Sequence, residues 1–104
     1  MIIVTTESLP GLNIKELKGF VKGSTVQSKF SGKDLMTGLK TIVGGEIKEY
    51  TVMLNDAREK SIERMKEEAT VMGANAIIGM RLVTSTVMQG ASEIIAYGTA
   101  VWAE

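Results

Sequence analysis

Among the polar residues outside the strongly charged middle of the chain, five are candidates for chemistry: Lys18, Lys22, Arg81, Glu93 and Tyr97. The chain has no histidine and no cysteine, so it cannot form Ser-His or Cys-His nucleophile pairs. The usual ligands of zinc, copper and iron are missing as well. Acid–base chemistry would have to use Asp, Glu, Lys or Tyr. No catalytic constellation stands out, and we expect a protein that is not an enzyme.

The stretch MGANAIIGM, Met72–Met80, has the glycines and the asparagine of a possible phosphate loop. A P-loop needs G-x-x-x-x-G-K-[ST] between a strand and a helix, but Gly73 and Gly79 are six apart and no lysine follows. The dinucleotide fingerprint G-x-G-x-x-G is not met either. We therefore predict that Gly73 ends a helix in the left-handed conformation. Gly79 is expected to permit close packing on a strand.

Seven methionines could suggest a soft-metal site built from thioethers. Met53, Met65 and Met72 share the apolar stripe of a predicted helix, however, and methionine is a common core residue. The carboxylates are interleaved with Lys and Arg, and no calcium-loop pattern occurs. We predict no metal site and no cofactor, and keep metal binding through oxygen or methionine ligands as an alternative.

Two extended segments open the chain. Met1–Thr6 is β-branched and is followed by a turn at Pro10. Glu16–Ser28 is a second extended segment, interrupted by Gly19 and Gly23, which indicate a bulge, a bend or a close backbone contact.

Two helices are predicted next. Ser31–Gly45 has an apolar stripe at helical spacing and ends at Gly44 and Gly45. Glu49–Met72 is a longer amphipathic helix whose charged face should be solvated. Asn75, just beyond its end, either caps this helix or faces a neighbouring subunit.

The last third of the chain predicts an antiparallel hairpin. Its parts are the strand Ala74–Met88, the turn Gln89–Ser92 and the strand Glu93–Ala103, with Arg81 and Glu93 pairing across it. Both faces of the last strand are apolar, whereas one long helix can cover only one face of a small sheet. We therefore expect a second subunit on the other face, whose candidate interface residues are Ile95, Tyr97 and Val101.

Composition limits the class of protein. With 104 residues, the chain is expected to form a single domain, residues 1–104. Twelve basic and twelve acidic residues give zero net charge, which does not favour nucleic acid or an anionic membrane as partner. No apolar run is long enough to span a bilayer, and the start does not resemble a secretory signal. We expect a cytoplasmic protein.

Several stretches together resemble the YbjQ-like family, small bacterial and archaeal proteins labelled "putative heavy-metal-binding". They are VTT (4–6), KTIVGG (40–45), DARE (56–59), MGANAIIGMRL (72–82) and SEIIAYGTAV (92–101). The resemblance covers nearly the whole chain and implies a two-layer α+β subunit. It also implies an antiparallel sheet packed on one long helix, with a short helix and a β-α-β-β core like that of dodecin subunits.

The same resemblance implies a ring-shaped homo-oligomer, a pentamer, but carries over no metal ligand. Our leading hypothesis is therefore a homo-oligomeric binding or scaffold protein without catalysis. Besides the metal alternative, we keep open an enzyme site assembled between subunits around Lys22, Arg81 or Tyr97.

Overall fold

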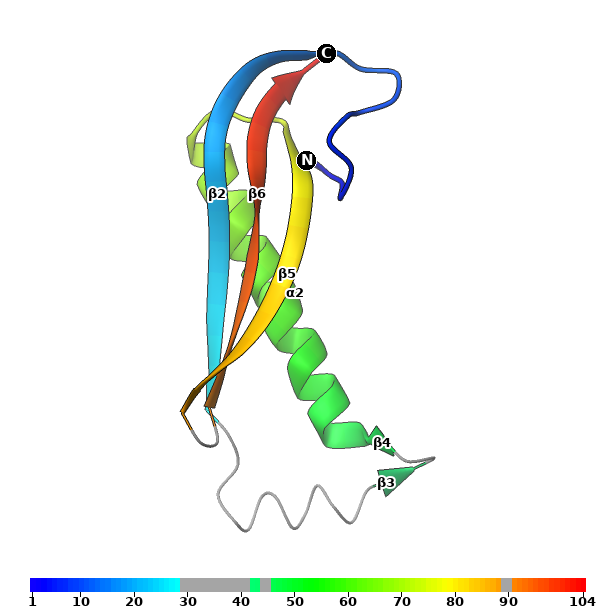
Figure 1. Ribbon diagram of the computed structural model, residues 1–104, viewed down its shortest axis with the longest axis vertical. Helices are drawn as coiled ribbons and strands as arrows, with labels where there is room; N and C mark the ends of the chain where they lie inside the picture. The colour runs from blue at the N-terminus through cyan, green and yellow to red at the C-terminus, as the bar shows by residue number, and fades with distance from the viewer. Residues whose placement is uncertain (29–41, 44–45, 89–90) are drawn as a thin grey trace.

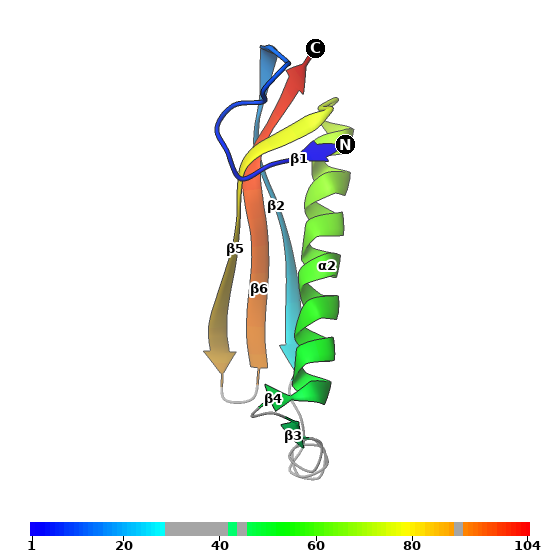
Figure 2. The ribbon, with the colours of Figure 1, turned by 90° about the vertical axis from the view of Figure 1, so that its right-hand side faces the viewer.

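The computed structural model describes residues 1–28, 42–43, 46–88 and 91–104 as an α+β protein of two layers (Figures 1 and 2). One layer is a four-stranded sheet in the order β1-β5-β6-β2, and the other is a single long helix. The elements are β1 (Ile2–Ile3), β2 (Ile14–Ser28), β3 (Ile42–Val43), β4 (Glu46–Ile47), α2 (Lys48–Val71), β5 (Ala76–Met88) and β6 (Ala91–Ala103).

The sheet is built around the predicted hairpin. β5 and β6 pair antiparallel, and β2 pairs antiparallel with the other side of β6. This gives the expected β-α-β-β core of β2, α2, β5 and β6. β1 departs from the expected antiparallel sheet, because its two residues pair in parallel with the start of β5. The described sheet is therefore mixed.

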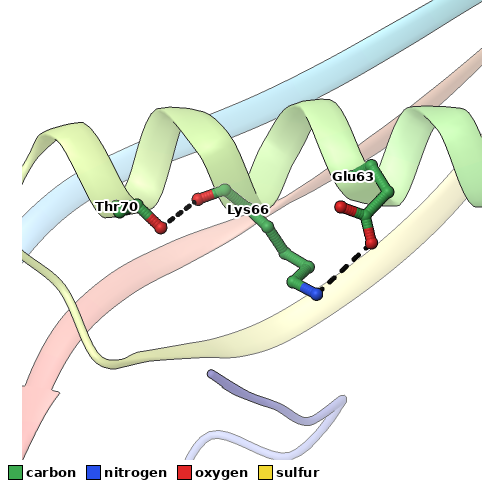
Figure 3. Close-up of polar contacts among 3 residues, drawn as sticks. All are labelled: Glu63, Lys66 and Thr70. Atoms are coloured by element: carbon green, nitrogen blue, oxygen red, sulfur yellow. Dashed lines mark hydrogen bonds and ion pairs between the residues drawn. The ribbon is translucent and has the colours of Figure 1, made fainter.

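Helix α2 begins and ends within one residue of the predicted helix. Its end forms a Schellman motif, in which Gly73 N–H donates to Thr70 O and Ala74 N–H donates to Ala69 O, both at 3.0 Å. Gly73 has a φ of +83°, which confirms the predicted left-handed residue. On the exposed side, Lys66 forms an ion pair with Glu63 at 3.3 Å (Figure 3).

Helix α2 packs very closely against the sheet at Gly23 of β2. A Cβ added there would overlap the backbone of Ser61 and Met65 and lie 2.8 Å from the Cβ of Arg64. This confirms the close backbone contact predicted for this strand. Beside it, the buried Ser61 hydroxyl lies 2.9 Å from Ile94 O and 3.0 Å from Thr25 Oγ1, which satisfies it within the core.

The face of the sheet opposite α2 is here called the outer face, and among the described elements it is covered near the chain termini alone. There the segment after β1 crosses the sheet (Figure 2). Leu9 of this segment forms a small core with Ala76, Val101 and Ala103. The remainder of the outer face has no covering element among the described residues.

Asn75 connects the helix end to the last strand. Its Nδ2 donates to Ala103 O at 2.7 Å, and its Oδ1 accepts from Ala103 N at 2.8 Å. The side chain thus takes the place of a paired strand residue and does not act as the helix cap that was one of its two predicted roles. Its other predicted role, facing a neighbouring subunit, stays a prediction.

Other predictions are corrected or lie outside the described residues. Ile42 and Val43, expected in the short helix, form β3, which pairs with β4. The rest of that helix up to residue 41, together with Gly44 and Gly45, lies outside the described residues. So do residues 89–90 of the predicted turn, while Ala91 and Ser92 belong to β6.

Candidate ligand patch on the outer sheet face

Three of the candidate residues form one row across the outer face. In the register of the sheet, Lys22 of β2 and Arg81 of β5 both lie opposite Tyr97 of β6. Residues opposite each other in antiparallel strands project to the same side. Val21 and Gly23, which flank Lys22 on β2, are buried against the helix, so the row faces away from it.

A β-bulge at Gly79 and Met80 brings Arg81 into this row. Ile78 lies opposite Thr99 and Arg81 opposite Tyr97, so β5 has one extra residue between these pairs. Gly79 has a φ of +61°, and nothing lies within 4 Å of a Cβ added to it. The glycine therefore serves the left-handed backbone of the bulge and not the close packing predicted from the sequence. Without the extra residue, Met80 would stand in the row.

Arg81 is held by backbone carbonyls. Its Nη1 donates to Thr5 O at 2.9 Å and to Met80 O at 2.8 Å. The predicted pairing with Glu93 is wrong, because Glu93 lies opposite Ser85, four residues farther along β5. In the part of the chain that the structure describes, no acceptor is seen for Arg81 Nε or Nη2.

Among the residues that the structure describes, no carboxylate is bound to the ammonium group of Lys22 either. The nearby Glu68 accepts a hydrogen bond from the backbone N–H of Lys22 at 3.3 Å, at the edge of the sheet. The ion pairs seen between described residues are Glu63–Lys66 and Lys18–Glu16. Both cations of the row are therefore left without a neutralising partner in this part of the chain.

Tyr97 lies between the two cations. Its ring centroid is 6.4 Å from that of Phe20, with the planes tilted by 44°. Among described residues, no partner is seen for its hydroxyl group. The register neighbours of the row on this face are Phe20, Ser24, Ile78, Val83, Ile95 and Thr99, none of which is acidic. This patch offers hydrogen-bond donors and apolar surface, without a carboxylate to act as base.

The three residues predicted as an interface differ in their exposure. Ile95 and Tyr97 lie half-buried on the outer face. Val101 is only 1% exposed, because it packs under Leu9 within the same chain. It is therefore removed from the candidate interface. The sequence analysis missed Phe20, whose exposed ring lies beside Tyr97. One aromatic residue in a strand gives no signal in the sequence, and its position next to Tyr97 follows only from the strand register.

Comparison with known proteins identifies the family. The family described as "Putative heavy-metal-binding" matches residues 1–104. The UPF0145 protein of Halalkalibacterium halodurans is 59% identical over 100% of this chain and 98% of its own length. The chain belongs to the YbjQ family.

The YbjQ family is present in both bacteria and archaea. A UPF0145 protein from Methanosarcina acetivorans is 54% identical over 97% of this chain and 95% of its own. A crystal structure of a protein of unknown function from Pediococcus pentosaceus, assigned to the DUF74 family, superimposes with a TM-score of 0.67 at 18% identity. The superposition covers 100% of this chain and 98% of that one and supports the fold alone.

The metal description of the YbjQ family can be tested against the side chains present. Within the described ranges, no group of three or more Asp and Glu side chains is placed to hold a metal ion. Met65, Met72 and Met80 do share one hydrophobic cluster, in which Met65 is fully buried. No helix of the described chain is long and apolar enough to cross a membrane.

Proposed function

We propose that this YbjQ-family protein is a homo-oligomeric binding or scaffold module of the cytoplasm, a ring of five subunits that acts without catalysis. The observation that carries the proposal is the edge of β5 beyond Met80, which no described strand or helix covers. All eight residues from Arg81 to Met88 are exposed, and only Arg81 is charged. Soluble proteins normally protect such an edge with lysine, proline or a covering segment.

The backbone of this edge is oriented for pairing. The N–H of Lys22 points away from β6 towards Glu68, so the peptide groups of Tyr97, its register partner, face β5 and pair with Arg81. Alternation along β5 then turns the N–H of Thr84 towards the free edge. A strand from another subunit can bond there without disturbing the existing ladder.

The asymmetry of the described sheet supports the proposal of a ring. The edge of β5 beyond Met80 and the edge formed by β2 are different surfaces of one sheet. Contacts between unlike surfaces are head-to-tail, and they close into a ring when the rotation permits it. The number five comes from the family resemblance.

Native mass spectrometry at micromolar concentration tests the assembly. We expect a pentamer for the natural protein and for Thr84→Ala, which keeps the edge N–H. Thr84→Pro removes that donor at an edge position where the monomer tolerates proline, and it should yield smaller species. A monomeric natural protein, or a pentamer that the proline variant retains, would contradict the proposal.

A second candidate function is soft-metal binding, favoured by the shared cluster of Met65, Met72 and Met80. Equilibrium dialysis against Cu(I), Zn(II), Ni(II) and Mn(II), followed by elemental analysis, should then retain only Cu(I). Met80→Leu should lower the bound copper. Met88→Leu, at an exposed methionine outside the cluster, should not. No stoichiometric metal after dialysis would end this candidate.

A further inference from the structure

We propose that the row Lys22–Tyr97–Arg81 binds a small organic oxyanion, a phosphate or carboxylate attached to an aromatic or apolar group. The inference names a ligand class for the proposed binding module and rests on that role. It does not require the ring, because all three residues belong to one chain. The oxyanion would lie between the two cations, and its apolar group would lie over Phe20.

The charges of the row favour an anion. Lys22 and Arg81 are separated by two strand spacings, about 10 Å, so their long side chains can reach one group above Tyr97. The chain as a whole has zero net charge, yet this row carries two positive charges and no register neighbour is acidic. Glu93 is the next acidic residue on this face of β6, and Ile95 separates it from Tyr97. An anion would supply the missing counter-charge.

Arg81 is positioned in advance for such a ligand. The two carbonyls that bind Nη1 fix one side of the guanidinium group. Its Nε and Nη2 have no acceptor among the described residues, and arginine binds carboxylate and phosphate through two parallel hydrogen bonds. Because the protein already holds the side chain, less conformational entropy is lost on binding.

Tyr97 and Phe20 supply the other half of the site. The Tyr97 hydroxyl has no partner among described residues and can donate to the oxyanion. The Phe20 ring is 63% exposed beside it, a large apolar surface that costs free energy when left in water. A ligand that joins an anion to a ring matches both features, whereas an inorganic ion matches only one.

Titration by isothermal calorimetry with four probes tests the proposal. Phenyl phosphate and benzoate carry both features, inorganic phosphate lacks the ring, and benzyl alcohol lacks the charge. We expect saturable binding of phenyl phosphate or benzoate below about 10 mM. Whichever of these two probes binds more tightly shows whether the site prefers a phosphate or a carboxylate. Inorganic phosphate and benzyl alcohol should bind at least about tenfold more weakly.

Variants assign the binding to the row. Lys22→Gln should weaken binding of the stronger aromatic probe by about tenfold, and Tyr97→Phe by about threefold. Lys60→Gln removes an exposed cation from the helix and should change it by less than about twofold. Arg81→Gln also removes the hydrogen bond to Thr5 O, so circular dichroism is used to check that this variant keeps the fold.

Three results would overturn the proposal: no saturable binding, no effect of Lys22→Gln, or equal effects of Lys22→Gln and Lys60→Gln. Light scattering on the same samples measures the oligomeric state, so the test of ligand binding and the test of the ring give separate results. A monomer that binds phenyl phosphate supports the patch and contradicts the assembly. A pentamer that binds none of the probes supports the assembly and contradicts the ligand patch.

Discussion

The two faces of the sheet use the same strands in opposite ways. Facing α2, the strands present small or apolar side chains that are fully buried, among them Val21, Ala96 and Ala100. Facing outwards, the alternate residues Phe20 and Val26 are more than half exposed, although both are apolar. The inner face is fixed by contacts within the chain. The outer face retains apolar surface, and its cations Lys22 and Arg81 have no carboxylate partner among the described residues.

The largest effect should come from the inner face at Gly23. Gly23→Ala places a Cβ against the backbone of Ser61 and Met65, which cannot rotate away, so α2 must shift as a whole. We expect a loss of about 3 kcal/mol in the free energy of unfolding, measured by chemical denaturation.

Ser24→Ala, at the next residue on the outer face, is the matched control and should change stability by less than about 0.5 kcal/mol. Equal free energies of unfolding for Gly23→Ala and Ser24→Ala would contradict the close contact between α2 and β2.

Asn75→Ala should have the next largest effect. It removes both hydrogen bonds to Ala103, and we expect a loss of about 2 kcal/mol. The control is Asn13→Ala, because Asn13 pairs with Glu104 through its backbone alone, and those bonds survive the change. Hydrogen exchange of the Ala103 amide checks the cause. It should become faster in Asn75→Ala and stay unchanged in the control.

Gly73→Val tests the helix end. A β-branched residue at a φ of +83° should cost about 1 kcal/mol or more of unfolding free energy. Gly73→Asn, which tolerates the left-handed conformation, should lose less. Equal thermal unfolding midpoints for natural protein and Gly73→Val would show that this backbone strain is absent.

Local patterns were sufficient to predict some features of this fold. Helical spacing and Gly73 gave the limits of α2 to within a residue, since amphipathic stripes and glycine caps depend on neighbouring residues alone. The hairpin followed from the apolar, β-branched segments around its turn.

Features that depend on strand register could not be predicted. Arg81 faces outwards only because the bulge at Gly79 adds one residue, and a shift of one position moves every side chain to the other face. The bonds from Asn75 to Ala103 join residues 28 apart. The cover over Val101 depends on the path of the segment that carries Leu9. Periodicity contains none of this information, so the candidate residues were known individually but not as a row.

The smallest change in unfolding free energy is expected for a substitution on the outer face. It tests directly whether the outer face, unlike the inner face, is left exposed. Val26→Thr keeps a β-branched residue opposite Glu93 and removes apolar surface that is already 60% exposed. Within one chain this should change unfolding free energy by less than about 0.5 kcal/mol. If subunits cover the face, a larger loss should appear at high protein concentration and diminish on dilution, because association contributes to stability by mass action. Thermal unfolding of Val26→Thr across a hundredfold concentration range therefore separates an exposed outer face from one that another subunit covers.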